Sequence, residues 1–275
     1  MSHSTVDVGA LGRLLRRWRA DRGMSQLALA LDAGVSQRHL SFVESGRAKP
    51  GRAVLQRLCD GLQVPLRERN EFLLAAGFAP EYPERELSAP EFAPVFDALQ
   101  SMLAQQEPFP AVVVDRHWNV LMANRASERV FFPFLPDDFD PCALFPDGRR
   151  NAMRFTCHPR GLRPAIDNWP ALAPLLFARL AAETRANPFD QPLQALRDEI
   201  RALLPAAAAA AAPSGAGDLP VAPLHLSRGG LEIRLFSAIA SIGTPLDVTA
   251  QELRLELFFA ADGESTDRVR QLAAD

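Results

Sequence analysis

Gln37 and Arg38 carry the most specific chemistry in this sequence. A glutamine amide can make paired hydrogen bonds to an adenine edge in the major groove of DNA, and a guanidinium group can do the same with guanine. Both residues follow Ser36, and serine favours the position just before a helix. The sequence therefore predicts a helix whose first turn presents an amide and a guanidinium group to a duplex.

Two short helices are needed to position these side chains. Leu40 and Val43 give the helix a side to bury, and Gly46 ends it. A preceding helix begins after Ser25 and ends at Gly34, since glycine adopts a left-handed conformation at little cost. Its expected apolar run at helical spacing consists of Leu27, Ala28 and Leu31. Two helices joined by a short turn with a glycine form a helix-turn-helix.

Further helices surround this motif. Apolar residues recur at helical spacing in residues 11–21 and 54–62, and a fifth helix covers 72–76. Five helices within residues 1–79 can bury a small core. We therefore expect an all-α N-terminal domain over residues 1–79.

The N-terminal motif resembles the Cro-like, xenobiotic-response-element family of bacterial and phage repressors. The similarity lies in MSQ at 24–26, AGVS at 33–36, HLSFVESG at 39–46 and RAKP at 47–50. By this resemblance, Arg19 and Glu44 form an internal ion pair, and an operator in double-stranded DNA is the partner. The DNA contacts that it implies are Gln26, Ser36, Gln37, Arg38, His39, Ser41 and Phe42 near bases, and Arg47, Lys49 and Arg52 on phosphates. Ser36 fits a helix cap equally well.

The charge distribution agrees with a DNA-binding N-terminal end. The chain has a net charge of −3, but residues 1–79 hold 12 Arg and Lys against 7 Asp and Glu, a net +5, which leaves −8 for the remainder. A basic domain on an acidic body suits nucleic acid at one end only. No apolar run approaches 18 residues, so we expect no membrane span and a cytoplasmic protein.

Residues 80–275 predict a second domain. Residues 80–107 form a proline-rich linker and a connecting helix from Val95 to Gln106, which could pack against its copy in a homodimer. Alternating apolar residues predict strands at 111–115, 119–123, 224–226, 231–240 and 253–259. Helices at 169–183 and 193–204 would cover one face of this antiparallel sheet. The segment 205–217 reads as a surface connection, and 132–148 is irregular.

The order of these elements resembles the MmyB-like regulators, in which a Cro-type domain precedes a PAS-like ligand-binding domain. The matching segments are RERNEFLLAAGFAPEY at 67–82, VVVDRHWNVLMANRA at 112–126, LRPAIDNWP at 162–170 and LFSAIASIGTPLDVTAQELRLELFFAAD at 235–262. The resemblance implies an α+β PAS-like domain at 108–262, with 263–275 as a C-terminal tail or helix. It also implies a small lipophilic, fatty-acid-like ligand.

Side chains of two kinds could contact such a ligand. Aromatic and apolar groups would line a cavity, while polar ones such as His158, Asn168 and the nearby Arg160 and Arg163 could meet a carboxylate head group. The candidates are Trp118, Met122, Phe155, His158, Asn168, Trp169, Phe236 and Phe258. The aromatic residues equally fit a plain hydrophobic core, and the charged ones a solvated surface.

The leading hypothesis is a dimeric, ligand-responsive transcriptional regulator. An alternative is a metabolite-binding protein or enzyme that uses the helix-turn-helix as an interaction module, and only Cys142, Cys157 and His158 bring a thiol near an imidazole in the sequence. A third is an antitoxin-like partner of another protein, against which the large second domain argues. With three scattered cysteines and no CxxC or HExxH motif, we expect no metal, no cofactor and no catalytic residue.

Overall fold

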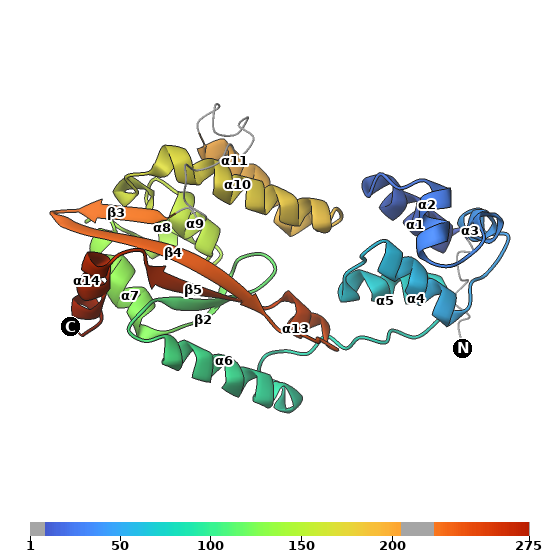
Figure 1. Cartoon of the computed structure of the whole chain (residues 1–275), viewed down its shortest axis with the longest axis horizontal. Helices are drawn as coiled ribbons and strands as arrows, with labels where there is room; N and C mark the ends of the chain where they lie inside the picture. Colours follow the sequence, from blue (N-terminus) through green and yellow to red (C-terminus); the bar gives the residue numbers. More distant parts are fainter. Residues whose placement is uncertain (1–8, 205–222, 275) are drawn as a thin grey trace. The chain divides into compact units, whose positions relative to one another are not determined.

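The computed structural model describes residues 9–204 and 223–274, so the expected surface connection at 205–217 lies outside the described residues. The chain divides into two compact units. The first consists of residues 1–86 and 244–251, and we name it the DNA-binding unit after its expected role; the second consists of 87–243 and 252–275, and we name it the sensor unit for the same reason. In Figure 1 the blue helices α1 to α5 and most of the red-brown helix labelled α13 (Val248–Glu252) therefore belong to the first unit.

Five helices precede residue 80, as the sequence predicts, and the all-α expectation is confirmed. Their bounds are α1 Ala10–Asp21, α2 Gln26–Asp32, α3 Gln37–Glu44, α4 Arg52–Gly61 and α5 Leu66–Ala75. The glycines that end α2 and α3 adopt left-handed φ angles of 62° at Gly34 and 74° at Gly46. Trp18, Leu40 and Phe72 lie fully buried between the helices. This core fixes the orientation of α3.

Helix α2 buries a different side from the expected one. Leu27 and Leu31 are 51 % and 72 % exposed, whereas Leu29 and Ala30 are buried. Helix α2 is only seven residues long and packs against α3 and α4 through its second turn. Because so short a helix shows barely two turns of pattern, the apolar spacing could not identify the buried side, and the prediction for Leu27 and Leu31 was wrong.

A segment from far along the chain completes the DNA-binding unit. Residues 244–251, with most of the short helix α13 Val248–Glu252, belong to it although they follow residue 243 of the sensor unit in sequence. The Arg85 guanidinium pairs with the Asp247 carboxylate at 2.9 Å, and the backbone N–H of Leu66 donates to Gln251 Oε1 at 2.8 Å. No local pattern in the sequence predicts this insertion.

The sensor unit is built on the expected five-stranded antiparallel sheet. Its strands are β1 Ala111–Val114, β2 Val120–Ala123, β3 Leu224–Arg228, β4 Leu231–Ser241 and β5 Arg254–Ala260. The strand order is β2-β1-β5-β4-β3, so the first and last strands in the chain lie side by side at its centre. In that register Val112 of β1 faces Glu256 of β5, and Ile239 of β4 faces Glu256 from the other side.

Helices cover this sheet. Figure 1 shows α10 and α11 on one side of the sheet and α6 on the other. The core on the α10 side includes Trp118, Val130, Leu180 and Ile200. The remaining elements are η1 Pro90–Phe92, α6 Ala93–Gln106, α7 Arg125–Phe131, η2 Phe132–Phe134, α8 Pro141–Leu144, α9 Ala152–Cys157, η3 Arg163–Ala165, α10 Trp169–Ala186, α11 Gln191–Leu203 and α14 Gly263–Ala274. The predicted covering helices are thus present.

A buried carboxylate joins the turn between β1 and β2 to helix α11. Asp190, whose side chain is 3 % exposed, accepts from Arg116 Nε at 2.5 Å, lies 3.0 Å from His117 Nε2 and caps α11 through the N–H of Leu193. Arg116 also donates to Glu252 at 2.7 Å. Burial would raise the pKa of Asp190, but these hydrogen bonds and the charge of Arg116 lower it to about 2. The sequence had indicated no partner for His117.

We predict that Asp190→Asn lowers the free energy of unfolding by about 2 kcal/mol at pH 7. Asparagine still caps a helix, so the loss isolates the charge. Because the folded pKa lies below the unfolded value, the contribution is complete above about pH 4 and disappears as the pH falls through about 2. Urea unfolding of wild type and variant between pH 7 and pH 3 measures it. A difference that stays constant over this range would contradict the assignment.

Candidate functional site

Helix α3 exposes the residues that the sequence singled out. Gln37 and Arg38 are exposed, while Leu40 and Val43 on the opposite side are fully buried. Ser36 caps the helix, because its hydroxyl accepts from the N–H of His39 at 3.1 Å. Half-buried His39, Ser41 and Phe42 lie beside the two exposed residues, and the Arg38 guanidinium stacks on the Phe42 ring at 5.4 Å. The first turn and outer side of α3 therefore form one polar surface with an aromatic ring.

The carboxylate of Glu44 fixes α3 to the helices before it. Its side chain is 2 % exposed and accepts from Arg19 at 2.8 and 3.1 Å, so the ion pair that the resemblance implied is present. Gln26 Nε2 donates to the same carboxylate at 2.7 Å. Arg16 donates to the backbone oxygen of Glu44 at 2.6 Å. Three helices thus meet at the last residue of α3.

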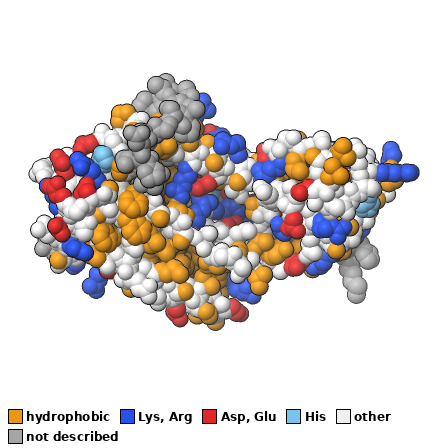
Figure 2. Space-filling model, viewed as in Figure 1, with side chains coloured by type: hydrophobic (Ala, Val, Ile, Leu, Met, Phe, Trp, Pro, Cys, Tyr) orange, Lys and Arg blue, Asp and Glu red, His pale blue; other side chains and the backbone are white. Residues whose placement is uncertain are grey.

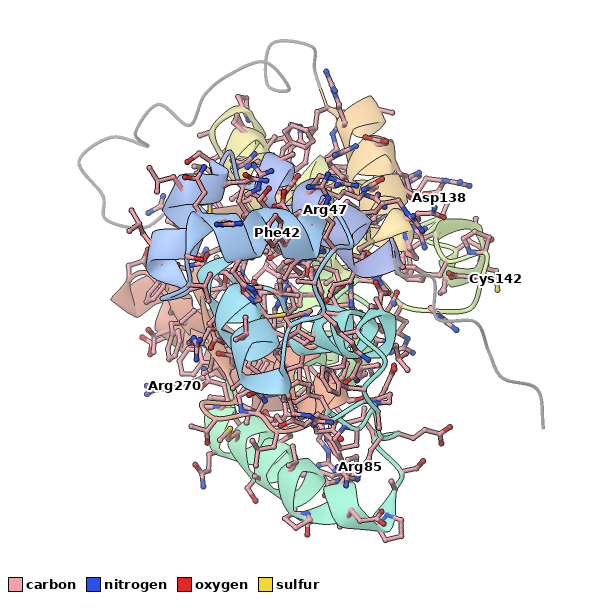
Figure 3. The ribbon with its side chains drawn as sticks, turned by 90° about the vertical axis from the view of Figure 1, so that its right-hand side faces the viewer. Phe42, Arg47, Arg85, Asp138, Cys142 and Arg270 are labelled. Atoms are coloured by element: carbon pink, nitrogen blue, oxygen red, sulfur yellow. The ribbon has the colours of Figure 1, made fainter. Side chains whose placement is uncertain are left out.

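Cations follow α3 in the chain. Arg47 and Lys49 are exposed, and Figure 3 shows Arg47 beside Phe42 on the outer surface of the blue helices. Lys49 and Arg52 both approach the ring of Phe78, at 5.5 and 5.3 Å. Arg52 also pairs with Glu81 at 3.1 Å, so its guanidinium is partly neutralised. Figure 2 shows Lys and Arg side chains at several places on the surface of this unit.

The sensor unit contains an apolar cavity of about 150 Å³. It lies between the sheet, helices α7 and α9, and the segment that follows α7. Phe131 is central to this wall, because its ring meets those of Phe258 and Phe155 edge-on at 5.2 and 6.3 Å. The other aromatic and aliphatic lining residues include Val112, Val120, Phe132, Phe139, Pro141, Phe145 and Leu162.

A second cavity, of about 80 Å³, adjoins the first. Trp118, Arg179 and Phe236 line it. The two cavities share part of their walls, namely Ala152, Thr156, Leu224, Glu256 and Phe258. They therefore form an apolar outer chamber and a smaller inner chamber with charged groups in its wall.

Comparison with known proteins agrees with both units. Residues 10–72 match a helix-turn-helix domain family, and residues 95–272 match the MmyB-like transcription regulator ligand binding domain. The second match covers more than half of the chain. The chain belongs to the MmyB-like regulator family. It is accordingly a DNA-binding transcription regulator with a ligand-binding domain. No curated protein matches the sequence. None of the helices in the described ranges has the length and apolar character needed to cross a membrane.

Four of the eight ligand candidates line the chambers of this MmyB-like domain. Phe155 and Phe258 belong to the outer chamber, and Trp118, Phe236 and again Phe258 to the inner one. Met122 lies on the other face of the sheet. It pairs with Val113 of β1, whereas the adjacent residue Val112 lines the cavity, and successive residues of a strand point to opposite faces.

The structure places His158, Asn168 and Trp169 outside both chambers, where each has a structural role. Asn168 holds strand β3, donating to the oxygen of Pro223 at 2.6 Å and accepting from the N–H of His225 at 3.0 Å. His158 accepts from the N–H of Arg160 at 3.1 Å, and burial, then the charge of Arg160, lower its pKa.

Trp169 is buried, and the Arg163 guanidinium stacks on its ring at 5.2 Å. Phe177, also considered from the sequence, packs against the core. Neither Arg160 nor Arg163 is among the described residues that line the two chambers.

Sequence reasoning missed the wall supplied by residues 132–148. Phe132, Phe139 and Phe145 line the outer chamber from this irregular segment. Its density of phenylalanine was a usable signal, because several aromatic residues close together in an irregular segment favour an apolar contact surface. Glu256 was also missed; as a charged residue in an alternating strand it was expected on the polar side of the sheet.

Burial makes the thiols of this MmyB-like protein poor nucleophiles. It raises the pKa of Cys157 and of Cys59 to about 12, so both remain protonated at neutral pH. The third cysteine, Cys142, is exposed and free. Cys157, which is adjacent to His158 in the sequence, is therefore not an activated nucleophile.

We predict that Gly12→Ala destabilises the DNA-binding unit by about 1–3 kcal/mol. A Cβ at this position would lie 2.2 Å from the backbone oxygen of Glu44, so α1 and α3 must separate. The matched control is Gly51→Ala, whose Cβ meets no atom within 4 Å and whose φ of −69° suits alanine. Thermal unfolding measures both. Equal effects of the two substitutions would show that the close contact does not hold α3.

Proposed function

We propose that the chain is a sequence-specific regulator that binds operator DNA through α3 as a cytoplasmic homodimer, and that a small lipophilic ligand with a fatty-acid-like apolar body modulates this binding. The observation that carries the DNA part is the exposure of Gln37 and Arg38 on a helix whose other side is fully buried. A recognition helix needs this combination, because only a rigidly seated helix can place two side chains against base edges.

The roles in DNA binding divide by residue type. Gln37, Arg38 and Ser41 read bases, since their side chains can hydrogen-bond to base edges. Gln26, Ser36, His39 and Phe42 support them at the same surface. Arg47 and Lys49 bind phosphate, and Arg52 joins them if it exchanges Glu81 for the DNA backbone. In a homodimer, two copies of α3 would meet half-sites about 34 Å apart.

The ligand part rests on the outer chamber. Its volume of about 150 Å³ lies well below the ~300–1,000 Å³ usual for drug-sized ligands, and an apolar cavity of ~150 Å³ can hold benzene. Phenylalanine rings dominate its wall, so the occupant buries hydrocarbon there. A short aliphatic chain or a single ring fits this space; a longer chain requires the rings of the wall to move.

The inserted segment 244–251 supports coupling between ligand and DNA. Within the DNA-binding unit, its Asp247 pairs with Arg85, and the N–H of Val248 donates to the oxygen of Pro83 at 2.8 Å. Strand β5 begins at Arg254, two residues after this segment, and carries Glu256 and Phe258 in the chamber wall. If β5 has two alternative positions and the ligand prefers one of them, ligand binding increases the population of that position. Because β5 is joined to the inserted segment, the conformation of the DNA-binding unit that accompanies this position is then populated more as well.

A single substitution on α3 tests base reading. Arg38→Ala is expected to remove preference at one base position, at a cost of about 1–3 kcal/mol for the selected operator. Lys49→Ala should instead weaken binding to all duplexes similarly. It should also make the slope of log K against log salt concentration less steep by about 0.9, the loss expected for one phosphate contact. In vitro selection of an operator, followed by fluorescence anisotropy at several salt concentrations, separates the two effects. Unchanged operator binding by Arg38→Ala would show that α3 does not read bases.

The coupling is tested by Asp247→Asn. Asparagine keeps the hydrogen bond from the N–H of Thr249 at 2.8 Å but loses the charge that pairs with Arg85. In wild type, saturating 1-octanol should change operator affinity by about 5–150-fold. In the variant this change should shrink towards onefold.

Glu84→Gln is the control for this variant, because it removes an exposed ion pair with Arg67 within the same unit. It should leave the effect of 1-octanol intact. An Asp247→Asn protein that responds fully to 1-octanol would contradict coupling through the inserted segment.

A further inference from the structure

Glu256 is an ionisable residue in the wall that the two chambers share, among mostly apolar lining residues. It lies on β5, the central strand, between Val112 and Ile239 of the neighbouring strands. Only 9 % of the residue is exposed, and it lines both the outer and the inner chamber. Any occupant that reaches from one chamber to the other passes this side chain.

The described partners of Glu256 leave its carboxyl group incompletely paired. It hydrogen-bonds with Ser237, and the nearest guanidinium nitrogen, that of Arg179, is 4.0 Å away. Arg179 itself stacks on the Trp118 ring at 4.6 Å and faces Glu183 at 3.6 Å. Burial raises the pKa of Glu256, which the Ser237 hydrogen bond and Arg179 only partly oppose. The group therefore has acceptor capacity that points into a space able to hold a ligand.

Both cations that line the chambers already face carboxylates. Arg179 faces Glu183 and Glu256, and Arg150 at the outer chamber pairs with Glu128 at 2.9 Å. A ligand carboxylate would enter beside Glu256 and compete with Glu128 or Glu183 for a cation. A hydroxyl or ammonium group would instead donate to Glu256 directly, and a charge-assisted hydrogen bond in a dry site is strong.

We propose that Glu256 determines ligand specificity, and that the ligand combines an apolar body with a hydrogen-bond-donating polar group, an amine or a hydroxyl, rather than a free carboxylate. This inference rests on the proposed function, because it names the polar end of the molecule whose apolar body fills the outer chamber. Glu256 accepts from the polar end, and the phenylalanine-lined chamber holds the hydrocarbon.

Three probes with the same chain test this assignment: octylamine, 1-octanol and octanoate. Calorimetric titration of the full chain at pH 7.5 should show octylamine and 1-octanol binding at least about tenfold more tightly than octanoate. Glu256→Gln keeps the size of the side chain but cannot carry a negative charge. It should lower the affinity for octylamine by about tenfold or more. The affinity for 1-octanol should stay within about threefold of wild type, because the amide oxygen still accepts a hydrogen bond from a hydroxyl.

Glu264→Gln is the matched control, because Glu264 is a solvent-exposed carboxylate of the sensor unit that pairs with Arg268 at 2.7 Å and lines neither chamber. A screened, exposed carboxylate contributes little, so octylamine affinity should stay unchanged in this variant. Equal loss in both variants would mean that overall charge, and not contact with Glu256, attracts the amine, and would overturn the proposal.

The remaining outcomes distinguish a failure of the role assigned to Glu256 from a failure of the chamber as a ligand site. Octanoate binding as tightly as octylamine to wild type, or full octylamine affinity in Glu256→Gln, overturns the role of Glu256 while the lipophilic chamber stands. Binding of none of the three probes overturns the chamber as a ligand site, and the specificity with it. If Glu256→Gln does not fold, the ranking of the three probes on wild type decides alone.

Discussion

Chain connectivity at the start of β5 is the constraint on which the rest of the structure depends. Residues up to Gln251 fold with the DNA-binding helices, and Arg254 already belongs to the central region of the sensor sheet. With two intervening residues, Gln251 and Arg254 are at most roughly 11 Å apart, so the connection cannot absorb a large displacement of the strand. One of the two, Glu252, is in addition held by Arg116, which Asp190 holds in turn. A change at the chamber wall therefore has a covalent route to the unit that carries α3.

Three buried carboxylates show how the same chemical group serves different ends. Glu44 and Asp190 are each closely paired with an arginine and further hydrogen-bonded, which makes them rigid joints between helices or between a turn and a helix. Removal of one partner from such a pair leaves a buried charge, so these joints resist substitution. Glu256 is also buried, although its side chain is slightly more exposed, and the guanidinium nitrogen of Arg179 lies 4.0 Å away. We infer that rigidity is concentrated where helices must be seated, and unmet hydrogen-bonding capacity where a ligand must be recognised.

Local patterns predicted the elements but not the long-range contacts. Helix caps such as Ser25 and Ser36, glycine turns and strand alternation correctly predicted the five N-terminal helices, the five strands and the exposed face of α3. Helix α2 was misjudged because seven residues cannot define a face. The partner of His117 lies 73 residues away, and residues 244–251 join helices far earlier in the chain, so no local signal existed for either. Four of the eight ligand candidates lie outside both chambers, because residue type alone does not indicate which cavity, if any, a side chain lines.

The central claim, that the chamber and the recognition helix are energetically coupled, has one most direct test. It is the affinity of the full chain for 1-octanol, measured by calorimetry with and without saturating operator DNA. Coupling is reciprocal, so operator DNA must change the affinity for 1-octanol by the same factor by which 1-octanol changes the affinity for DNA, and we predict a factor of about 5–150. An affinity for 1-octanol that is identical in the free and the DNA-bound protein would contradict the account.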